Sequence, residues 1–309
     1  MAVGFVILVW SADRFVLGSA AVARNFGISP LVIGLTIVGF GTSAPEMLVS
    51  AIASSTGAAD IAVGNVIGSN ITNVALVLGV AALITPMDVD GSVLRREVPV
   101  LIGCMLLATI LLLDGHLGRL DGAILLAALL LMMGWIVWLG LRSEDPDEHT
   151  EGVPAAMPIW KAALWIVIGL ALLLVSSRIL VWGAEELARL MGMPELVIGL
   201  SVVAVGTSLP ELAASVAAAR RHENEIAVGN VIGSNMFNIL GVLGLPGLIA
   251  PAPVAIEVLR RDLPAMFLIT LLAFGMSRFF LRPSHVTRFE GGILVTTFAG
   301  YMTWVYVAS

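Results

Sequence analysis

The feature that most constrains the fold is a long internal repeat. The ten residues IAVGNVIGSN occupy positions 61–70 and recur unchanged at positions 226–235. The match extends further at one constant offset of 165 residues, since LVIGLTIVGFGTSAPEMLVS at 31–50 is similar to LVIGLSVVAVGTSLPELAAS at 196–215. A chain repeated over this length is built from two copies of one structural unit.

The composition places both copies in a membrane. Hydrophobic residues make up 59% of the chain and charged residues 12%, whereas a soluble domain has about 45–50% and 25%. Apolar stretches of the ~20 residues needed to cross a bilayer recur along the whole sequence. We therefore expect a multi-pass protein of the cell membrane whose partners are the lipid bilayer and inorganic cations. We expect no nucleic-acid partner and no obligate protein partner.

The sequence predicts ten membrane-spanning helices separated by turn signals. They lie near residues 2–24, 30–56, 61–84, 98–114, 120–141, 158–190, 195–219, 226–249, 263–281 and 289–308. The repeat offset divides them into two sets of five. Because five is odd, the second set must enter the membrane upside down. The predicted fold class is an all-α integral membrane protein with ten transmembrane helices as two inverted repeats of five, an architecture of many secondary transporters.

We divide the chain into a first repeat (1–141), an acidic central loop (142–157) and a second, inverted repeat (158–309). A solvated linker and a regulatory ion site both remain open for the loop. Basic residues favour the cytoplasm, and the loops after odd-numbered spans hold ten of them against four on the other side. The ten are Arg24, Arg95, Arg96, Arg142, Lys161, Arg220, Arg221, Arg278, Arg282 and Arg288. We expect a cytoplasmic central loop and both termini outside.

Two glutamates fall in the middle of predicted spans, within GTSAPE (41–46) and GTSLPE (206–211). A charge at a helix centre costs ~2.5–3.5 kcal/mol on insertion scales, so Glu46 and Glu211 are expected to face a protein cavity. The prolines just before them lack the N–H and clash with the preceding turn. They predict a broken helix with free carbonyls in each repeat, which is tolerated at membrane depth where it lines a cavity.

Neutral oxygens accompany each glutamate. Thr42 and Thr207 precede the glutamates by four residues and share their helical face. A polar stripe at spacing i, i+4, i+8 follows in each repeat, formed by Asn65, Ser69, Asn73 and by Asn230, Ser234, Asn238. Such side chains either bind an ion or hydrogen-bond neighbouring helices. Asn70 and Asn235 lie off the stripe and are expected to hold backbone groups or a neighbouring helix instead. The pairs Gly64/Gly68 and Gly229/Gly233 allow helices to approach closely.

Other charged residues in or near the spans are expected to form ion pairs rather than contact a substrate. Glu97 and Asp262 each follow paired arginines, which predicts salt bridges at the membrane interface. Local ion pairing is the first expectation for five further residues: Asp13, Arg14, Arg178, Glu185 and Glu186.

The ligand set at mid-membrane is entirely oxygen. Ca²⁺ takes six to eight oxygen ligands, whereas softer metals prefer thiolate or imidazole. The two glutamates carry a charge of −2, which one Ca²⁺, two Na⁺ or two protons neutralise. The pattern predicts ion exchange without a cofactor. A cation channel is the alternative from a different functional class. Nothing resembles a nucleophile–base pair, so we expect no enzyme activity.

Taken together, GTSAPE with GNVIGSNITN and GTSLPE with GNVIGSNMFN resemble the two α-repeats of the calcium/cation antiporter superfamily, in particular a prokaryotic sodium/calcium exchanger. The resemblance covers both halves. It implies Ca²⁺/Na⁺ antiport by alternating access, with sliding of the long first and sixth helices and with H⁺ as the alternative counter-ion. It implies ion ligands on spans 2, 3, 7 and 8. Residue by residue, the implied ligands are Glu46, Glu211, Thr42, Ser43, Thr207, Ser208, Ser69, Asn73, Ser234, Asn238 and the carbonyls of Gly39 and Ala204.

One position departs from the family pattern. Some sodium/calcium exchangers carry an aspartate at the position of Asn238, whereas this chain has asparagine in both halves. Asparagine does not ionise and brings two N–H donors. The Na⁺ stoichiometry, the role of protons and any K⁺ requirement therefore stay open at the level of sequence.

Overall fold

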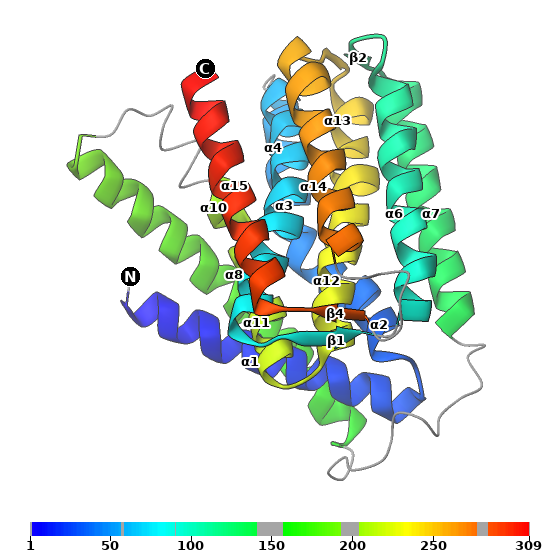
Figure 1. Cartoon of the computed structure of the whole chain (residues 1–309), viewed down its shortest axis with the longest axis vertical. Coiled ribbons are helices and arrows are strands. Elements are labelled where there is room, and N and C mark those ends of the chain that lie inside the picture. The colour runs from blue at the N-terminus through cyan, green and yellow to red at the C-terminus, as the bar shows by residue number, and fades with distance from the viewer. Residues whose placement is uncertain are drawn as a thin grey trace.

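The computed structural model describes residues 2–56, 59–89, 91–140, 157–192, 204–276 and 284–308, and these residues are predominantly helical (Figure 1). Most of the predicted acidic loop and the first part of the predicted seventh span lie outside the described residues. Six of the described helical segments are long and apolar enough to cross a membrane by length and composition.

The first repeat forms five helical units close to the predicted spans. In chain order its helices are α1 (Ala2–Phe26), α2 (Pro30–Ile33), the π-helical turn η1 (Gly34–Val38), α3 (Gly39–Ser55), α4 (Ala59–Thr72), the π-helical turn η2 (Asn73–Val77), α5 (Leu78–Ile84), α6 (Gly91–Leu112) and α7 (Arg119–Gly140). The segments from α2 to α3 and from α4 to α5 are each continuous with their π-helical turns, so each makes one span.

The second repeat follows the same plan. Its described helices are α8 (Ile159–Leu190), α10 (Ala204–Thr207), α11 (Leu209–Arg220), α12 (Asn224–Phe237), the π-helical turn η4 (Asn238–Val242), α13 (Gly244–Ile249), the π-helical turn η5 (Val258–Asp262), α14 (Leu263–Met276) and α15 (Arg288–Ala308). The α8 helix has 32 residues, or ~48 Å, which exceeds the ~30 Å hydrocarbon core. The expectation that the sixth span is too long to cross upright is confirmed.

Two small antiparallel strand pairs display the inversion directly. Strand β1 (Met87–Val89) pairs with β4 (Ser284–Val286), and β2 (His116–Leu117) pairs with β3 (Ala252–Pro253). Each pair joins a loop of one repeat to a loop of the other, and the two pairs lie at opposite ends of the upright helices (Figure 1). Two copies of one unit in opposite orientations produce this arrangement, so the predicted inverted repeat is confirmed.

Helices α1 and α8 pack on each other and run obliquely past the more upright helices (Figure 1). Their backbones touch at two glycines. A Cβ on Gly18 would lie 2.7 Å from the carbonyl oxygen of Ala162, and a Cβ on Gly169 would lie 2.7 Å from the nitrogen of Phe15. Larger side chains at these positions would push the two helices apart.

Helix α12 lies at the centre of the fold, and all of its residues from Ile226 to Phe237 are buried. Glycines let it approach α2 and η1 closely, as predicted. A Cβ on Gly229 would meet the carbonyl oxygen of Leu31 at 2.8 Å, and a Cβ on Gly233 would meet that of Leu35 at 2.6 Å. A Cβ on Gly64 or Gly68 would meet no atom of the described residues within 4 Å.

Candidate functional site

The two predicted glutamates converge from opposite repeats. Glu46 on α3 is 1% exposed and Glu211 on α11 is 0% exposed, and α3 is hydrogen-bonded to the Glu211 carboxylate. The Ser43 hydroxyl donates to Glu211 Oε1 at 3.4 Å. Within the described chain, Glu211 Oε2 and both oxygens of Glu46 accept no hydrogen bond. Three carboxylate oxygens are thus available to a cation in a buried site.

Unpartnered neutral groups are concentrated at the predicted ligand positions. The amide nitrogens and oxygens of Asn73 and Asn238, and the hydroxyls of Ser69 and Ser208, are buried and make no hydrogen bond to described residues. A buried polar group left without a partner costs ~1–3 kcal/mol. Several such oxygens beside two carboxylates fit a coordinating role for a hard cation.

Asn73 and Asn238 each stand at the first residue of a π-helical turn, η2 and η4. The carbonyl of Asn238 accepts from the N–H of Leu243, five residues on, at 3.0 Å. Isolated π-helical turns are rare and frequently mark functional sites. Neither turn could be predicted from the sequence, because nothing in the local residue types distinguishes them from an α-helix. The only signal is that both begin at the third polar residue of the repeated stripe.

Thr42 and Ser234 meet where the two repeats touch. Thr42 Oγ1 lies 3.2 Å from Ser234 Oγ and donates to the carbonyl of Val38 at 3.1 Å or to Asn230 Oδ1 at 3.1 Å. Ser234 Oγ donates to the carbonyl of Gly39 at 3.4 Å. The predicted ligands Thr42, Ser234 and the Gly39 carbonyl therefore lie together at the contact between α3 and α12.

Asn230 connects three helices around the site rather than facing an ion. Its Nδ2 donates to the carbonyl of Glu211 at 3.2 Å and to Ser215 Oγ at 2.9 Å, while its Oδ1 lies within hydrogen-bonding distance of the hydroxyls of Thr42 and Ser234. With both donors and its carbonyl oxygen in use, Asn230 acts as a structural connection. Its counterpart Asn65 is only half-buried, and its buried Nδ2 has no described partner.

The off-stripe asparagines hold backbone groups, as predicted. Asn70 Nδ2 donates to the carbonyl of Val66 in its own helix at 2.8 Å. Asn235 Nδ2 donates to the carbonyl of Asn70 at 3.4 Å, and this hydrogen bond connects matching positions of the two repeats.

The predicted helix break occurs in one repeat only. In the second repeat Ser208 has φ −90° and ψ 8° and separates α10 from α11. Thr207 ends α10, and Ala204 begins it. In the first repeat α3 runs through Pro45 without interruption, so the predicted break there is wrong. The loss of one N–H leaves the α3 backbone helical, and the irregularity lies upstream in η1.

The remaining charged residues form ion pairs, most of them as predicted. Arg96 pairs with Glu97 at 2.7 Å and Arg261 with Asp262 at 2.7 Å. Arg189 pairs with Glu185 and Glu186, each at 3.8 Å. Three expectations of local pairing are wrong. Asp13 pairs with Arg221, 208 residues away in sequence, and the Arg14 guanidinium packs on the rings of both Trp10 and Trp165. Arg178 forms no ion pair with a described residue.

Among the described residues no three His, Cys, Asp or Glu side chains gather as a metal cluster. A cation between Glu46 and Glu211 would therefore rely on two carboxylates and a surrounding set of neutral oxygens. Such a site, with two buried carboxylates between inverted helical repeats, places the protein in the class of secondary ion transporters.

Comparison with known proteins gives the family. The model described as sodium/calcium exchanger protein matches residues 1–138 and 161–307, and the chain belongs to this family of membrane transporters. It is 44% identical to the inner membrane protein YrbG of Escherichia coli, covering 87% of this chain and 85% of the relative. It is 32% identical to the sodium/calcium exchanger MaX1 of Methanosarcina acetivorans, covering 98% and 96%.

Its structure is similar to that of the sodium–calcium exchanger NCX_Mj, with a TM-score of 0.84 and 33% identity. The match covers 100% of this chain and 96% of that one. The predicted resemblance is confirmed, and the protein is a multi-pass membrane cation antiporter.

Proposed function

We propose that this antiporter exchanges Ca²⁺ for Na⁺ across the cell membrane by alternating access to one site at the membrane midplane. The observation that carries the proposal is the pairing of Glu46 and Glu211. These carboxylates come from opposite repeats, are buried, and keep three oxygens free of hydrogen bonds from the described chain. Two such charges at membrane depth require a cationic partner.

The proposed ligands surround this pair. Besides the two glutamates they are Thr42, Ser43, Ser69, Asn73, Thr207, Ser208, Ser234, Asn238 and the carbonyls of Gly39 and Ala204. One Ca²⁺ neutralises the charge of −2, and two Na⁺ do the same. Because Ca²⁺ and Na⁺ compete for the same carboxylates, binding of one ion displaces the other. This competition is the physical requirement for exchange. The names of MaX1 and NCX_Mj support Na⁺ as the counter-ion.

Proton exchange is the second candidate, because two protons also neutralise Glu46 and Glu211. Asn238 does not ionise, so these two glutamates are the only ionisable groups among the proposed ligands. This limit on the charge of the site favours proton exchange. No cofactor takes part in either scheme.

We also propose a place for each part of the chain. Residues 1–141 and 158–309 are the two repeats that enclose the site, and residues 142–157 connect them on the cytoplasmic side. Both termini then face outward. The excess of basic residues in the loops after odd-numbered spans supports this orientation.

The test is ⁴⁵Ca²⁺ uptake into proteoliposomes loaded with Na⁺, repeated with a pH gradient in place of the Na⁺ gradient. We expect uptake driven by Na⁺, and we expect Glu46→Gln or Glu211→Gln to reduce it by about tenfold or more. Loss of a charged ligand costs ~1.5–3 kcal/mol, and each ~1.4 kcal/mol is a factor of ten.

Glu97→Gln is the matched control, because Glu97 is also buried but pairs with Arg96. Its uptake should remain near that of the unmodified protein. Uptake that follows only the pH gradient would select proton exchange. Ca²⁺ leak that needs no counter-ion would point to a channel, and full activity in both glutamate variants would disprove the site.

A further inference from the structure

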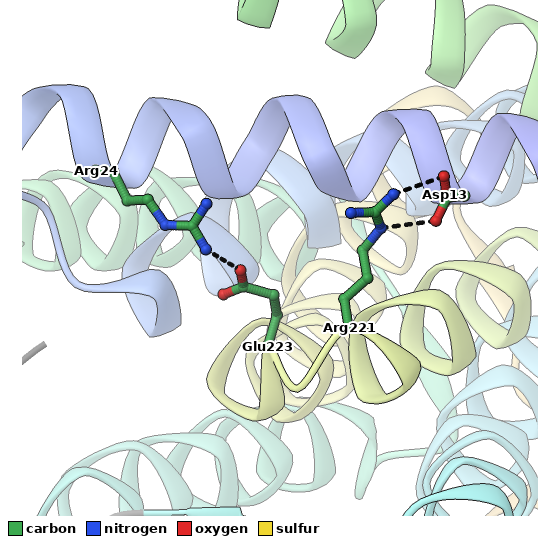
Figure 2. A network of polar contacts seen from close by, with 4 residues as sticks. All are labelled: Asp13, Arg24, Arg221 and Glu223. Atoms are coloured by element: carbon green, nitrogen blue, oxygen red, sulfur yellow. Dashed lines mark hydrogen bonds and ion pairs between the residues drawn. The ribbon is translucent and has the colours of Figure 1, made fainter. Parts of the chain in front are cut away.

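Two ion pairs outside the ion site tie α1 to the turn between α11 and α12 (Figure 2). Arg221 donates from Nε and Nη2 to the two carboxylate oxygens of Asp13, at 2.6 and 2.7 Å. Arg24 pairs with Glu223. The four side chains are 15–37% exposed, so solvent screens these pairs only partly.

The turn holds its two charged residues in a fixed arrangement. The N–H of Glu223 donates to the carbonyl of Ala218 at 2.9 Å, and that of His222 to Ala219 at 3.1 Å. This is the Schellman pattern of a helix C-terminus. Its left-handed residue, usually glycine, is His222 with φ 58°.

The order of the four charges specifies one position of α1 along the α11–α12 turn. Along α1 an acid, Asp13, precedes a base, Arg24, whereas along the turn the base Arg221 precedes the acid Glu223. The α1 pair is about 16 Å apart along the helix axis. A displacement of α1 by one helical turn, about 5.4 Å, would separate both pairs at once.

Neither ion pair has both of its charges at the matching positions of the opposite repeat. At the offset of 165 residues, the turn corresponds to three uncharged residues: Thr56, Gly57 and Ala58. On α8 the position matching Asp13 holds a base, Arg178, so the acid is missing as well. Two identical inverted repeats would make the two access states equal in energy. Two ion pairs that are not repeated at the matching positions contribute an energy difference between the two states.

Burial of the polar stripes indicates which side is closed. Gly229 and Asn230, near the end of α12 that joins the α11–α12 turn, are buried. At the matching end of α4, Gly64 is exposed and Asn65 is half-buried. Because the repeats are inverted, these two ends face opposite sides of the membrane. The ion pairs therefore lie on the sealed side.

We propose that Asp13–Arg221 and Arg24–Glu223 form an ionic latch that holds α1 on the α11–α12 turn. The latch keeps this side of the ion site closed and biases the ion-free protein toward the state open to the other side. It acts on α1, which packs backbone to backbone on α8, so its release frees both helices to move against the bundle. The latch rests on the proposed function only in requiring two access states.

The test measures how fast a buried cysteine on the latched face reacts with maleimide. Ala218 is 0% exposed and lies three residues before Arg221, on the same helical face. We introduce Ala218→Cys in a Cys104→Ser background and label the purified full-length protein without Na⁺ or Ca²⁺. We expect Asp13→Asn to raise the labelling rate about threefold and Asp13→Asn with Arg24→Gln about tenfold, from the usual strength of partly exposed ion pairs.

The charge exchange Asp13→Arg with Arg221→Asp should restore slow labelling. Glu186→Gln, which removes an ion pair within α8, should leave the rate unchanged. The latch is disproved if Asp13→Asn labels at the original rate, if the exchange does not restore it, or if Glu186→Gln has the same effect. Labelling needs no counter-ion, so failure of Na⁺-driven uptake would leave this result intact.

Discussion

At the scale of single residues, Asn230 shows how a polar side chain supports the site without occupying it. Its amide links Thr42 on α3, Ser215 on α11 and Ser234 on α12. We expect Asn230→Ala to leave several buried groups without partners, at ~1–3 kcal/mol each. Thermal unfolding in detergent should show the loss of stability, and ⁴⁵Ca²⁺ uptake should show a weaker apparent affinity.

Asn65→Ala is the control for this change, because Asn65 has the same place in the first repeat but its buried Nδ2 has no described partner. It should cost less stability than Asn230→Ala. Equal effects of the two substitutions would mean that the hydrogen bonds of Asn230 do not position the site.

The same two asparagines mark the limit of sequence reasoning at this scale. Glu46 and Glu211 could be identified because a mid-membrane charge is costly wherever it occurs. Asn230 and Asn238 could not be told apart, since both lie on one helical stripe at regular spacing. Only the packing of α3 and α11 against α12 shows that the Asn230 side chain has partners, while that of Asn238 has none among the described residues.

At the scale of elements, the contact between α1 and α8 depends on glycine. We expect Gly169→Ala to destabilise the protein by ~1–3 kcal/mol, because its Cβ would lie 2.7 Å from the nitrogen of Phe15 and backbone cannot move aside cheaply. It should also slow ion exchange if α1 and α8 move as a pair. Thermal unfolding and uptake rates measure the two effects.

Gly300→Ala is the comparison, since a Cβ on Gly300 in α15 would meet no atom of the described residues within 4 Å. Alanine is the better helix former by ~1 kcal/mol, so this variant should be as stable as the original or more so. A stable, fully active Gly169→Ala protein would show that the helices have room to separate.

Element lengths could be predicted because the hydrophobic stretches and the repeat offset define them independently. The π-helical turns η2 and η4 could not, since they depend on how the asparagine stripe packs between repeats. The strand pairs β1–β4 and β2–β3 were also missed. They contain two or three residues each and join loops of opposite repeats, so no local sequence pattern predicts them.

At the scale of the whole molecule, the inverted repeat fixes the architecture but not which face is cytoplasmic. Equivalent arginine pairs, Arg95/Arg96 and Arg260/Arg261, fall on opposite sides and cancel. The remaining basic residues decide the orientation, and they favour a cytoplasmic central loop. With this orientation the proposed latch lies on the cytoplasmic side, and the state with α1 latched is open to the outside.

This orientation predicts the reactivity of two engineered cysteines in intact cells. In a Cys104→Ser background, a membrane-impermeant maleimide should label Ser309→Cys at the C-terminus and should not label Thr150→Cys in the central loop. Permeabilised cells should label both, which controls for expression and reactivity. The reverse pattern in intact cells would invert the whole assignment. The latch would then close the outer side, because the loops after odd-numbered spans share one face and change sides together.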